Sequence, residues 1–203
     1  MLRAKEKRER ALGVKLGLKA ERCNSPKCAM VRRPQRPGMH GKNRKQFSEF
    51  GTQLAEKQKI VFSYGLREAQ MRKIFKEAQH KKESVSETIV SLLERRLDNV
   101  VYRLGFAPSR ISARQYVSHG HFTVNGRRIT IPSYQVKVKD VIRIRPESVS
   151  LQIFKNIKDV IKKYEAPDWL SVDKDKIEGT VKTLPHDIES PFDINLVVDF
   201  YSK

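Results

Sequence analysis

Arg110 and Arg114 are the residues whose type and spacing most clearly suit a chemical task. They lie one helical turn apart after Ser109, a residue type that caps helix N-termini. A guanidinium group binds phosphate through two parallel N–H donors, and the free backbone N–H groups at a helix start also attract anions. We therefore expect the Ser109–His119 helix to bind phosphate groups, although a merely solvated face shows the same pattern. Further hydrogen bonds from this surface are expected from Gln115, Ser118 and His119.

The other reactive side chains do not form a catalytic or metal-binding pattern. His119 and His121 have no carboxylate or serine partner evident in the sequence, so we expect no enzymatic activity. Cys23 and Cys28 form a C-x4-C pair, but neither Cys nor His precedes Cys23, and His40 is the one conceivable third ligand. Because a tetrahedral zinc site needs four ligands, we expect neither a metal nor a cofactor.

The charge of the chain indicates a polyanionic partner. Its 203 residues include 42 Lys and Arg against 23 Asp and Glu, a net charge of +19. The net charge is +11 over residues 1–50, +3 over 51–100, +7 over 101–150 and −2 over 151–203. The polyanion should therefore contact the N-terminal arm and the central stretch, which leaves the C-terminal quarter for packing or protein contacts.

Sequence features also indicate the compartment. No apolar run approaches the ~20 residues that span a membrane, and the N-terminus lacks the apolar segment of a secretory signal. Two cysteines without such a signal indicate a reducing environment and no disulfide framework. We expect a cytoplasmic protein without a membrane partner, since a charge spread over several elements does not suit an amphipathic membrane binder.

The elements that must position the two arginines surround them in the chain. Apolar residues recur at helical spacing from Ile89 to Leu104, which predicts one helix ending at Gly105. Asn125-Gly126 after the apolar run 122–124 predicts a hairpin with a tight primed turn.

Alternating residues predict further strands around this hairpin. Strands are expected over 136–138 and 141–145, with Ile142 and Ile144 facing the core and Arg143 and Arg145 facing outward.

The regions on both sides of this central stretch have other sequence patterns. Residues 1–46 are a basic arm, weakly helical as far as Ala20 and then rich in Pro and Gly; the arm is either a solvated disordered tail or a segment that orders between phosphates. Residues 47–80 predict helices on both sides of a break at Gly65. Residues 154–164 predict a helix, and 169–172 and 179–181 predict short strands. The C-terminal residues, with Asp193 as a helix cap, are too apolar for a loose tail and should dock on the helical region.

The motifs of residues 95–126 resemble a known RNA-binding module. Arg95-Arg96-Leu97-Asp98-Asn99-Val100-Val101-Tyr102-Arg103-Leu104-Gly105-Phe106, with Ser109-Arg110, Ala113-Arg114 and Val124-Asn125-Gly126, is similar to the module named after small-subunit ribosomal protein four. That module also occurs in pseudouridine synthases, some tyrosyl-tRNA synthetases and heat-shock RNA binders. The flanks Arg36-Pro37-Gly38-Met39-His40-Gly41, Ser48-Glu49-Phe50-Gly51, Tyr64-Gly65 and Phe200-Tyr201-Ser202-Lys203 resemble the bacterial-type ribosomal protein family itself.

This resemblance implies a fold and a function. The fold is α+β: a mostly helical domain with an inserted α/β RNA-binding module, in which two helices pack on a small antiparallel sheet, and a basic N-terminal arm. We expect the arm at 1–46, the helical domain at 47–94 closed by 187–203, the module at 95–158 and its extension at 159–186. The resemblance implies a structural constituent of the small ribosomal subunit, a primary rRNA-binding protein that nucleates assembly of the subunit body. It also implies contact with ribosomal protein five, which supports translational accuracy, and proximity to mRNA near the entry channel.

Candidate RNA-contacting residues are the cationic and polar side chains of the arm, the helical domain and the module. They are Arg3, Arg10, Arg22, Arg32, Arg33, Arg36, His40, Arg44, Lys45, Lys57, Arg67, Arg103, Ser109, Arg110, Arg114, Gln115, Ser118, His119 and Arg127. Asp98 and Asn99 are expected to shape the module, and Asn125-Gly126 to form its turn.

Three other functions compete with a structural rRNA-binding role. An enzyme such as a pseudouridine synthase would need a catalytic domain, and the chain outside the arm and module is too short for one. A regulator of its own mRNA would use the same surface and stays open. DNA binding is the weakest, because no recognition helix with base-reading residues is evident.

Overall fold

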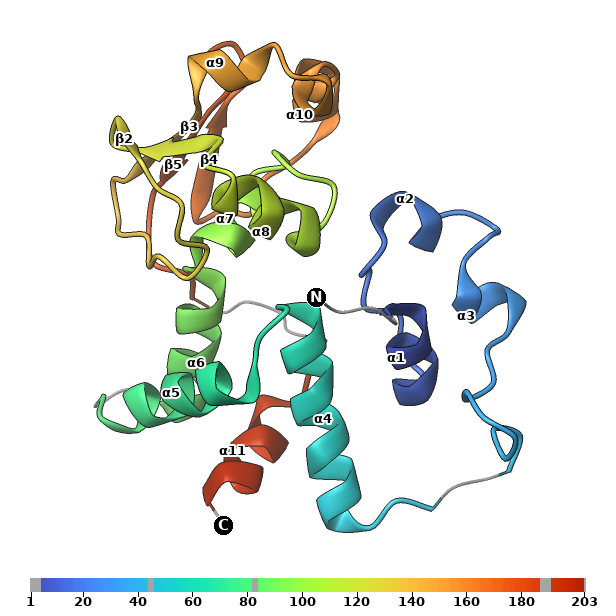
Figure 1. Cartoon of the computed structure of the whole chain (residues 1–203). Coiled ribbons are helices and arrows are strands. Elements are labelled where there is room, and N and C mark those ends of the chain that lie inside the picture. Colours follow the sequence, from blue (N-terminus) through green and yellow to red (C-terminus); the bar gives the residue numbers. More distant parts are fainter. Residues whose placement is uncertain (1–4, 44–45, 82–83, 187–190, 203) are drawn as a thin grey trace. The chain divides into compact units, whose positions relative to one another are not determined.

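The computed structural model describes residues 5–43, 46–81, 84–186 and 191–202 (Figure 1). The chain divides into two compact units. One comprises Met1–Ile89 with Glu189–Lys203, and the other comprises Val90–Ile188. Together they form the α+β fold that the sequence predicts. None of the helices in the described ranges has the length and apolarity needed to cross a membrane.

The first unit is helical. Its helices are α1 (Lys5–Leu12), α2 (Ala20–Cys23), α3 (Ala29–Arg32), α4 (Glu49–Ser63), α5 (Glu68–Gln79), the start of α6 (Val85–Glu94) and α11 (Ile194–Ser202). The side chain of Ser48 accepts a hydrogen bond from Gly51 N at 3.2 Å and so caps α4. Gly65 separates α4 from α5 with φ at +64°, a conformation that glycine adopts without strain.

The C-terminal helix α11 lies against α4 and also contacts α5 (Figure 1). Asp193 caps it, because its Oδ1 accepts hydrogen bonds from Asn195 N at 3.0 Å and Leu196 N at 3.3 Å. Aromatic rings hold the packing: Phe200 lies 5.5 Å from Phe50, and Tyr201 lies 5.1 Å from Phe75, between ring centroids. The expected cap and the expected docking of this segment are both present.

The described part of the basic arm, residues 5–43, contains three short helices and a few buried side chains. Leu18, Cys23 and Cys28 are buried together with the carboxylate of Glu9. The helical stripe predicted as far as Ala20 was wrong beyond Leu12, because α1 ends there and Gly13 takes a φ of +70°. The arm buries few side chains, because its composition is mostly polar.

The second unit packs helices on a sheet. It contains α7 (Leu97–Arg103), α8 (Arg110–Ser118), α9 (Pro146–Val149), the 3-10 helix η1 (Gln152–Phe154) and α10 (Ile157–Lys163). Its strands are β1 (Phe122–Val124), β2 (Arg127–Arg128), β3 (Val141–Ile144), β4 (Leu170–Asp173) and β5 (Glu178–Val181), in the antiparallel order β2-β1-β3-β5-β4. Figure 1 shows α7 and α8 side by side beneath this sheet.

One apolar core joins the helices and the sheet of this unit. Leu97, Val101 and Leu104 from α7 pack with Ala113 and Val117 from α8. Strand residues face them from the sheet, and Phe154, Ile157 and Ile161 close the core. The predicted orientation of β3 is confirmed for Ile142 and Ile144, which are buried, and for Arg143, which is exposed. Arg145, predicted to face outward from the same strand, lies beyond the end of β3 and is half-buried, because its guanidinium group turns toward the Gly120 oxygen. The Asn125-Gly126 turn is also confirmed, with positive φ at both residues.

Three element predictions for this unit were wrong. The helix expected from Ile89 to Leu104 is broken at Arg95 and Arg96, because the backbone of this segment turns aside to pair with residues 134–136. The strand expected over 136–138 is absent, and only the bridge between Arg96 and Gln135 forms there. The helix expected over 154–164 begins only at Ile157, after η1.

Candidate RNA-binding surface

Helix α8 presents its arginines through a well-formed N-terminus. Ser109 is extended, with φ −155° and ψ 158°, and its Oγ accepts a hydrogen bond from Ser112 N at 3.2 Å. Ala113 and Val117 turn into the core, which leaves Arg110 and Arg114 on another side of the helix. The predicted cap and helix are confirmed.

A buried carboxylate, Glu94, organises the cationic side chains of α7 and α8. It is fully buried at the end of α6, and its Oε1 and Oε2 accept hydrogen bonds from Arg103 NH2 and Nε, both at 2.9 Å. Oε2 also accepts from Asn99 Nδ2 at 2.8 Å, and Arg110 NH2 lies 3.9 Å from Oε1. Arg110 donates from Nε to Asn99 Oδ1 at 2.7 Å. The cationic ends of Arg103 and Arg110 therefore share one buried anchor.

Asp98 forms a second anchor beside the first. Its carboxylate accepts hydrogen bonds from Arg96 Nε at 3.2 Å and Arg96 NH2 at 2.9 Å, and Arg114 NH1 lies 3.8 Å away. Burial raises the pKa of the Asp98 carboxyl, and the guanidinium groups of Arg96 and Arg114 oppose that rise. The expectation that Asp98 and Asn99 shape the module agrees with these contacts.

The anchored arginines still reach solvent. The side chains of Arg103, Arg110 and Arg114 are 28%, 18% and 34% exposed. Arg110 also lies over the Tyr102 ring, with its guanidinium carbon 4.8 Å from the centroid. Because these side chains are already fixed, binding an anion costs less conformational entropy than it would for free arginines. Four arginines against two carboxylates leave this cluster positively charged.

The outer end of the module adds exposed polar groups. Gln115, Ser118 and His119 are exposed near the end of α8, and Arg127 is exposed on β2. Arg128 NH2 donates to the backbone oxygen of His119 at 3.4 Å.

His121 adjoins this surface but is turned inward. Its Nδ1 lies 3.0 Å from Ser148 Oγ, and its ring packs edge-on against Tyr116 and Phe154. Burial lowers the pKa of His121, and nearby His119, Arg145 and Arg128 lower it further.

The predicted residues of the helical region and arm do not gather at one point. Lys57 donates to Glu68 Oε2 at 3.0 Å and lies 4.5 Å from the Phe200 centroid, so it is largely covered. Arg67 is exposed ahead of α5. Arg22 pairs with Glu6 at 2.9 Å, and Arg10 Nε donates to the Gln35 oxygen at 3.0 Å.

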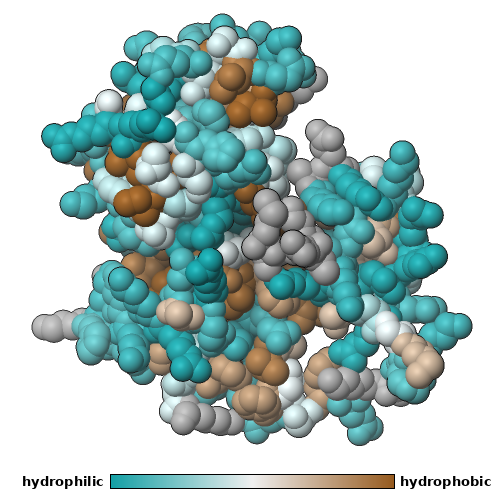
Figure 2. Space-filling view, viewed as in Figure 1, coloured by the Kyte–Doolittle hydropathy of each residue, from teal (hydrophilic) through white to brown (hydrophobic). Residues whose placement is uncertain are grey.

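The remaining arm candidates are mostly open to solvent. Arg32, Arg33 and His40 are exposed, and Arg36 lies over the Phe47 ring at 4.8 Å. Arg3, Arg44 and Lys45 lie outside the described residues. On the face seen in Figure 2, the surface over α1, α2 and α3 is mostly hydrophilic.

One cysteine of the pair, Cys23, lies beside a buried carboxylate. Glu9 Oε1 accepts hydrogen bonds from Leu16 N at 2.9 Å and Leu18 N at 3.3 Å, and Cys23 Sγ lies 3.9 Å from it. Burial raises the pKa of the Cys23 thiol. No three His, Cys, Asp or Glu side chains gather as metal ligands would within the described ranges.

Sequence reasoning missed the residues that hold the site together. Glu94, Arg96 and Glu9 were not singled out, although each is buried and charged. A lone acid in a helix looks like a solvated residue, and only its burial beside arginines from other elements distinguishes it. The one sequence signal was the position of Glu94 directly after the apolar pair Leu92-Leu93.

Both parts of the chain match models of known protein families. A model described as "S4 domain" matches residues 95–142, and one described as "Ribosomal protein S4/S9 N-terminal domain" matches residues 1–94. The small ribosomal subunit protein uS4 of Gloeobacter violaceus is 48% identical over 96% of this chain and 94% of its own length. Those of Caldicellulosiruptor bescii and Acetivibrio thermocellus are 51% and 49% identical, each over 94% of this chain and 93% of their own length.

Proposed function

The chain belongs to the family of small ribosomal subunit protein uS4, and from this premise we propose that it is a primary rRNA-binding protein that nucleates assembly of the subunit body. The resemblance seen in its motifs is confirmed. The family consists of structural ribosomal proteins and not of enzymes, which decides against the pseudouridine synthase alternative.

The observation that carries the proposal is the anchored arginine cluster of α7 and α8. Arg103 and Arg110 are held by Glu94, and Arg114 lies beside Asp98, while each stays partly exposed. Fixed guanidinium groups beside the N-terminus of α8 suit two phosphates at a set spacing. Such binding reads the shape of a folded RNA, here a five-way junction of the small-subunit rRNA, and not a base sequence.

Partners beyond rRNA follow from the same premise. We propose contact with ribosomal protein five, which supports translational accuracy, proximity to mRNA near the entry channel, and a place on the cytoplasmic ribosome. Support for a protein contact comes from the net charge of −2 over residues 151–203 and from the exposed apolar side chains Val149, Leu151 and Ile153.

The test is binding to full-length small-subunit rRNA, with random RNA of equal length as the competitor. The wild-type chain should protect the junction region in footprinting, and affinity should fall steeply with salt. Binding no tighter than to the random RNA would refute the proposal.

A matched pair of double variants tests the arginine cluster. Arg110→Ala with Arg114→Ala should weaken binding and reduce the slope of log affinity against log salt by about 1 to 2, since each arginine neutralises a phosphate. Lys158→Ala with Lys162→Ala removes the same charge at the same spacing from exposed positions of α10 and should change neither. Circular dichroism shows whether each variant keeps its helices. An equal loss of rRNA affinity in the two double variants would show that binding depends only on the total charge of the chain.

A further inference from the structure

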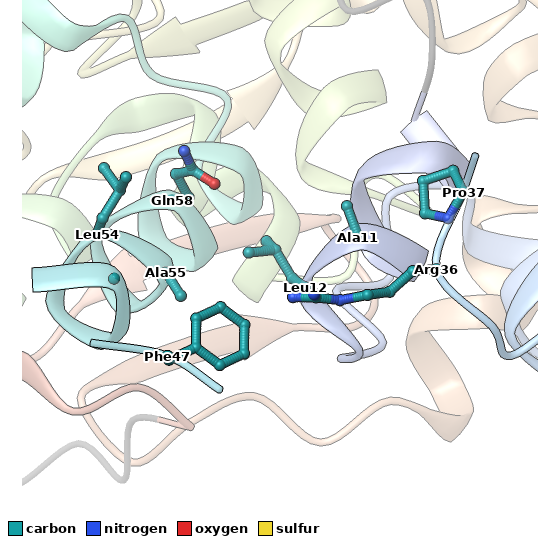
Figure 3. A pocket seen from close by; sticks show the side chains of 9 residues that line it. Ala11, Leu12, Arg36, Pro37, Phe47, Leu54, Ala55 and Gln58 are labelled. Atoms are coloured by element: carbon teal, nitrogen blue, oxygen red, sulfur yellow. The ribbon is translucent and has the colours of Figure 1, made fainter. Parts of the chain in front are cut away.

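A pocket of about 390 Å³ lies within the helical unit, between α1, residues 36–37 and the first half of α4 (Figure 3). Leu12, Leu54 and Pro37 contribute apolar walls. Figure 3 shows Gln58, Leu54 and Ala55 on one side, Leu12 and Ala11 on the other, and Arg36 reaching toward the Phe47 ring. Its volume lies within the ~300–1,000 Å³ range of small-molecule sites.

The polar and aromatic groups of this pocket suit a flat heteroaromatic ring. Phe47 is 48% exposed directly before Ser48, the cap of α4. The guanidinium carbon of Arg36 lies 4.8 Å from the Phe47 centroid, so two planar groups already face each other. The amide of Gln58 carries both a donor and an acceptor, as the edge of a nucleobase requires. The site therefore offers stacking together with an amide for hydrogen bonding.

The charge around the pocket favours RNA over an apolar protein segment. Residues 1–50 hold 15 Lys and Arg against four Asp and Glu. Of those acids, Glu6 is paired with Lys19 and Arg22, and Glu9 is buried. Arg33 and Lys42 are exposed in the neighbouring segment. A nucleotide brings a phosphate on each side of its base, which such a surface neutralises, whereas an apolar peptide supplies no anion to these cations.

We propose that this pocket receives one unpaired nucleobase of the rRNA. The base takes the place of the Arg36 guanidinium against the Phe47 ring, and the guanidinium moves onto the outer face of the base, which is then held between two planes. Gln58 reads the edge of the base. This proposal rests on the proposed rRNA binding and adds to it one site that holds a single nucleotide.

The first experiment compares two identical substitutions in the full-length chain. Phe47→Leu should weaken binding to full-length small-subunit rRNA roughly 5- to 150-fold, because stacking of one base contributes about 1–3 kcal/mol. Because Phe50 packs on Phe200 of α11, circular dichroism first shows that both variants keep their helices. Phe50→Leu is the matched control, since Phe50 is 58% exposed nearby but does not line the pocket. It should bind as the wild type does. Phe47→Tyr keeps the ring and should restore binding, which separates a stacking role from a structural one.

The second experiment identifies the nucleotide. Chemical probing of the complex with base-specific reagents should show one unpaired base that the wild type protects and Phe47→Leu leaves reactive. Replacing that nucleotide by an abasic one should weaken wild-type binding by the factor seen for Phe47→Leu. The wild type and Phe47→Leu should bind this abasic RNA with equal affinity, because the abasic nucleotide and the substitution each remove the same stacking interaction.

The outcomes separate this inference from the function on which it rests. If the wild type prefers rRNA to random RNA but Phe47→Leu and Phe50→Leu bind equally well, rRNA binding stands and the pocket does not hold a base. If the abasic and Phe47→Leu losses multiply, the base and the ring act independently, and the inference is again overturned. If the wild type shows no preference for rRNA, both proposals fall.

Discussion

Replacing Glu94 by Gln should destabilise the module and loosen its arginines at once. The change keeps the shape of the side chain but removes the charge that Arg103 meets through two hydrogen bonds of 2.9 Å. Removing one partner of a buried ion pair costs about 3–5 kcal/mol. Water can reach Arg103, whose side chain is 28% exposed, and the Gln oxygen still accepts one hydrogen bond. We therefore expect a smaller loss of about 2–3 kcal/mol in the free energy of unfolding.

Urea unfolding measures this loss, with fluorescence of Trp169 as the probe. Trp169 is the single tryptophan of the chain and is buried in the core that α7 and α8 share. With a urea dependence of about 1–3 kcal/mol per molar, the midpoint concentration of urea should fall by roughly 0.7–3 M. The matched control is Glu147→Gln, because the Glu147 side chain is 75% exposed beside Arg145 and its loss should cost about 0–1 kcal/mol.

Two results would contradict this reasoning. A midpoint shift for Glu94→Gln no larger than that for Glu147→Gln would show that the buried network does not stabilise the module. A large loss of stability without any loss of rRNA affinity, measured where both proteins are folded, would show that Glu94 does not position the arginines for binding.

Three further predictions concern other contacts. Tyr201 donates to Glu68 at 2.8 Å, so Tyr201→Phe should lower the free energy of unfolding by about 1 kcal/mol, seen as earlier loss of helical dichroism on heating; an unchanged transition would refute it. Gly179→Ala would put a Cβ 2.3 Å from Leu104 Cδ1 and should cost about 1–3 kcal/mol by Trp169 fluorescence in urea, and a neutral effect would contradict the close approach. Because the pKa of His121 is lowered, the unfolded chain takes up its proton more readily, so stability should fall as pH drops through about 6.5 and below. His121→Gln should flatten that dependence in urea titrations over this range, and a parallel fall would assign it to other groups.

The sequence by itself determined the features that depend on near neighbours in the chain. Ser109 caps α8 because its side chain reaches Ser112 N three residues on, and Asp193 caps α11 in the same way. Asn125-Gly126 makes its turn because these two residue types tolerate positive φ. The distribution of Lys and Arg indicated a polyanion without any knowledge of the fold.

Only the tertiary structure decided which distant groups meet. The helix predicted through Arg96 is broken because its backbone pairs with Gln135, and its guanidinium with the buried Asp98. Glu94 became an anchor because two helices, α7 with Asn99 and Arg103 and α8 with Arg110, meet at its buried carboxylate. An exposed charge interacts only weakly with its neighbours in water, whereas a buried charge must be paired. Burial depends on how distant elements pack, so residue spacing along the chain does not predict it.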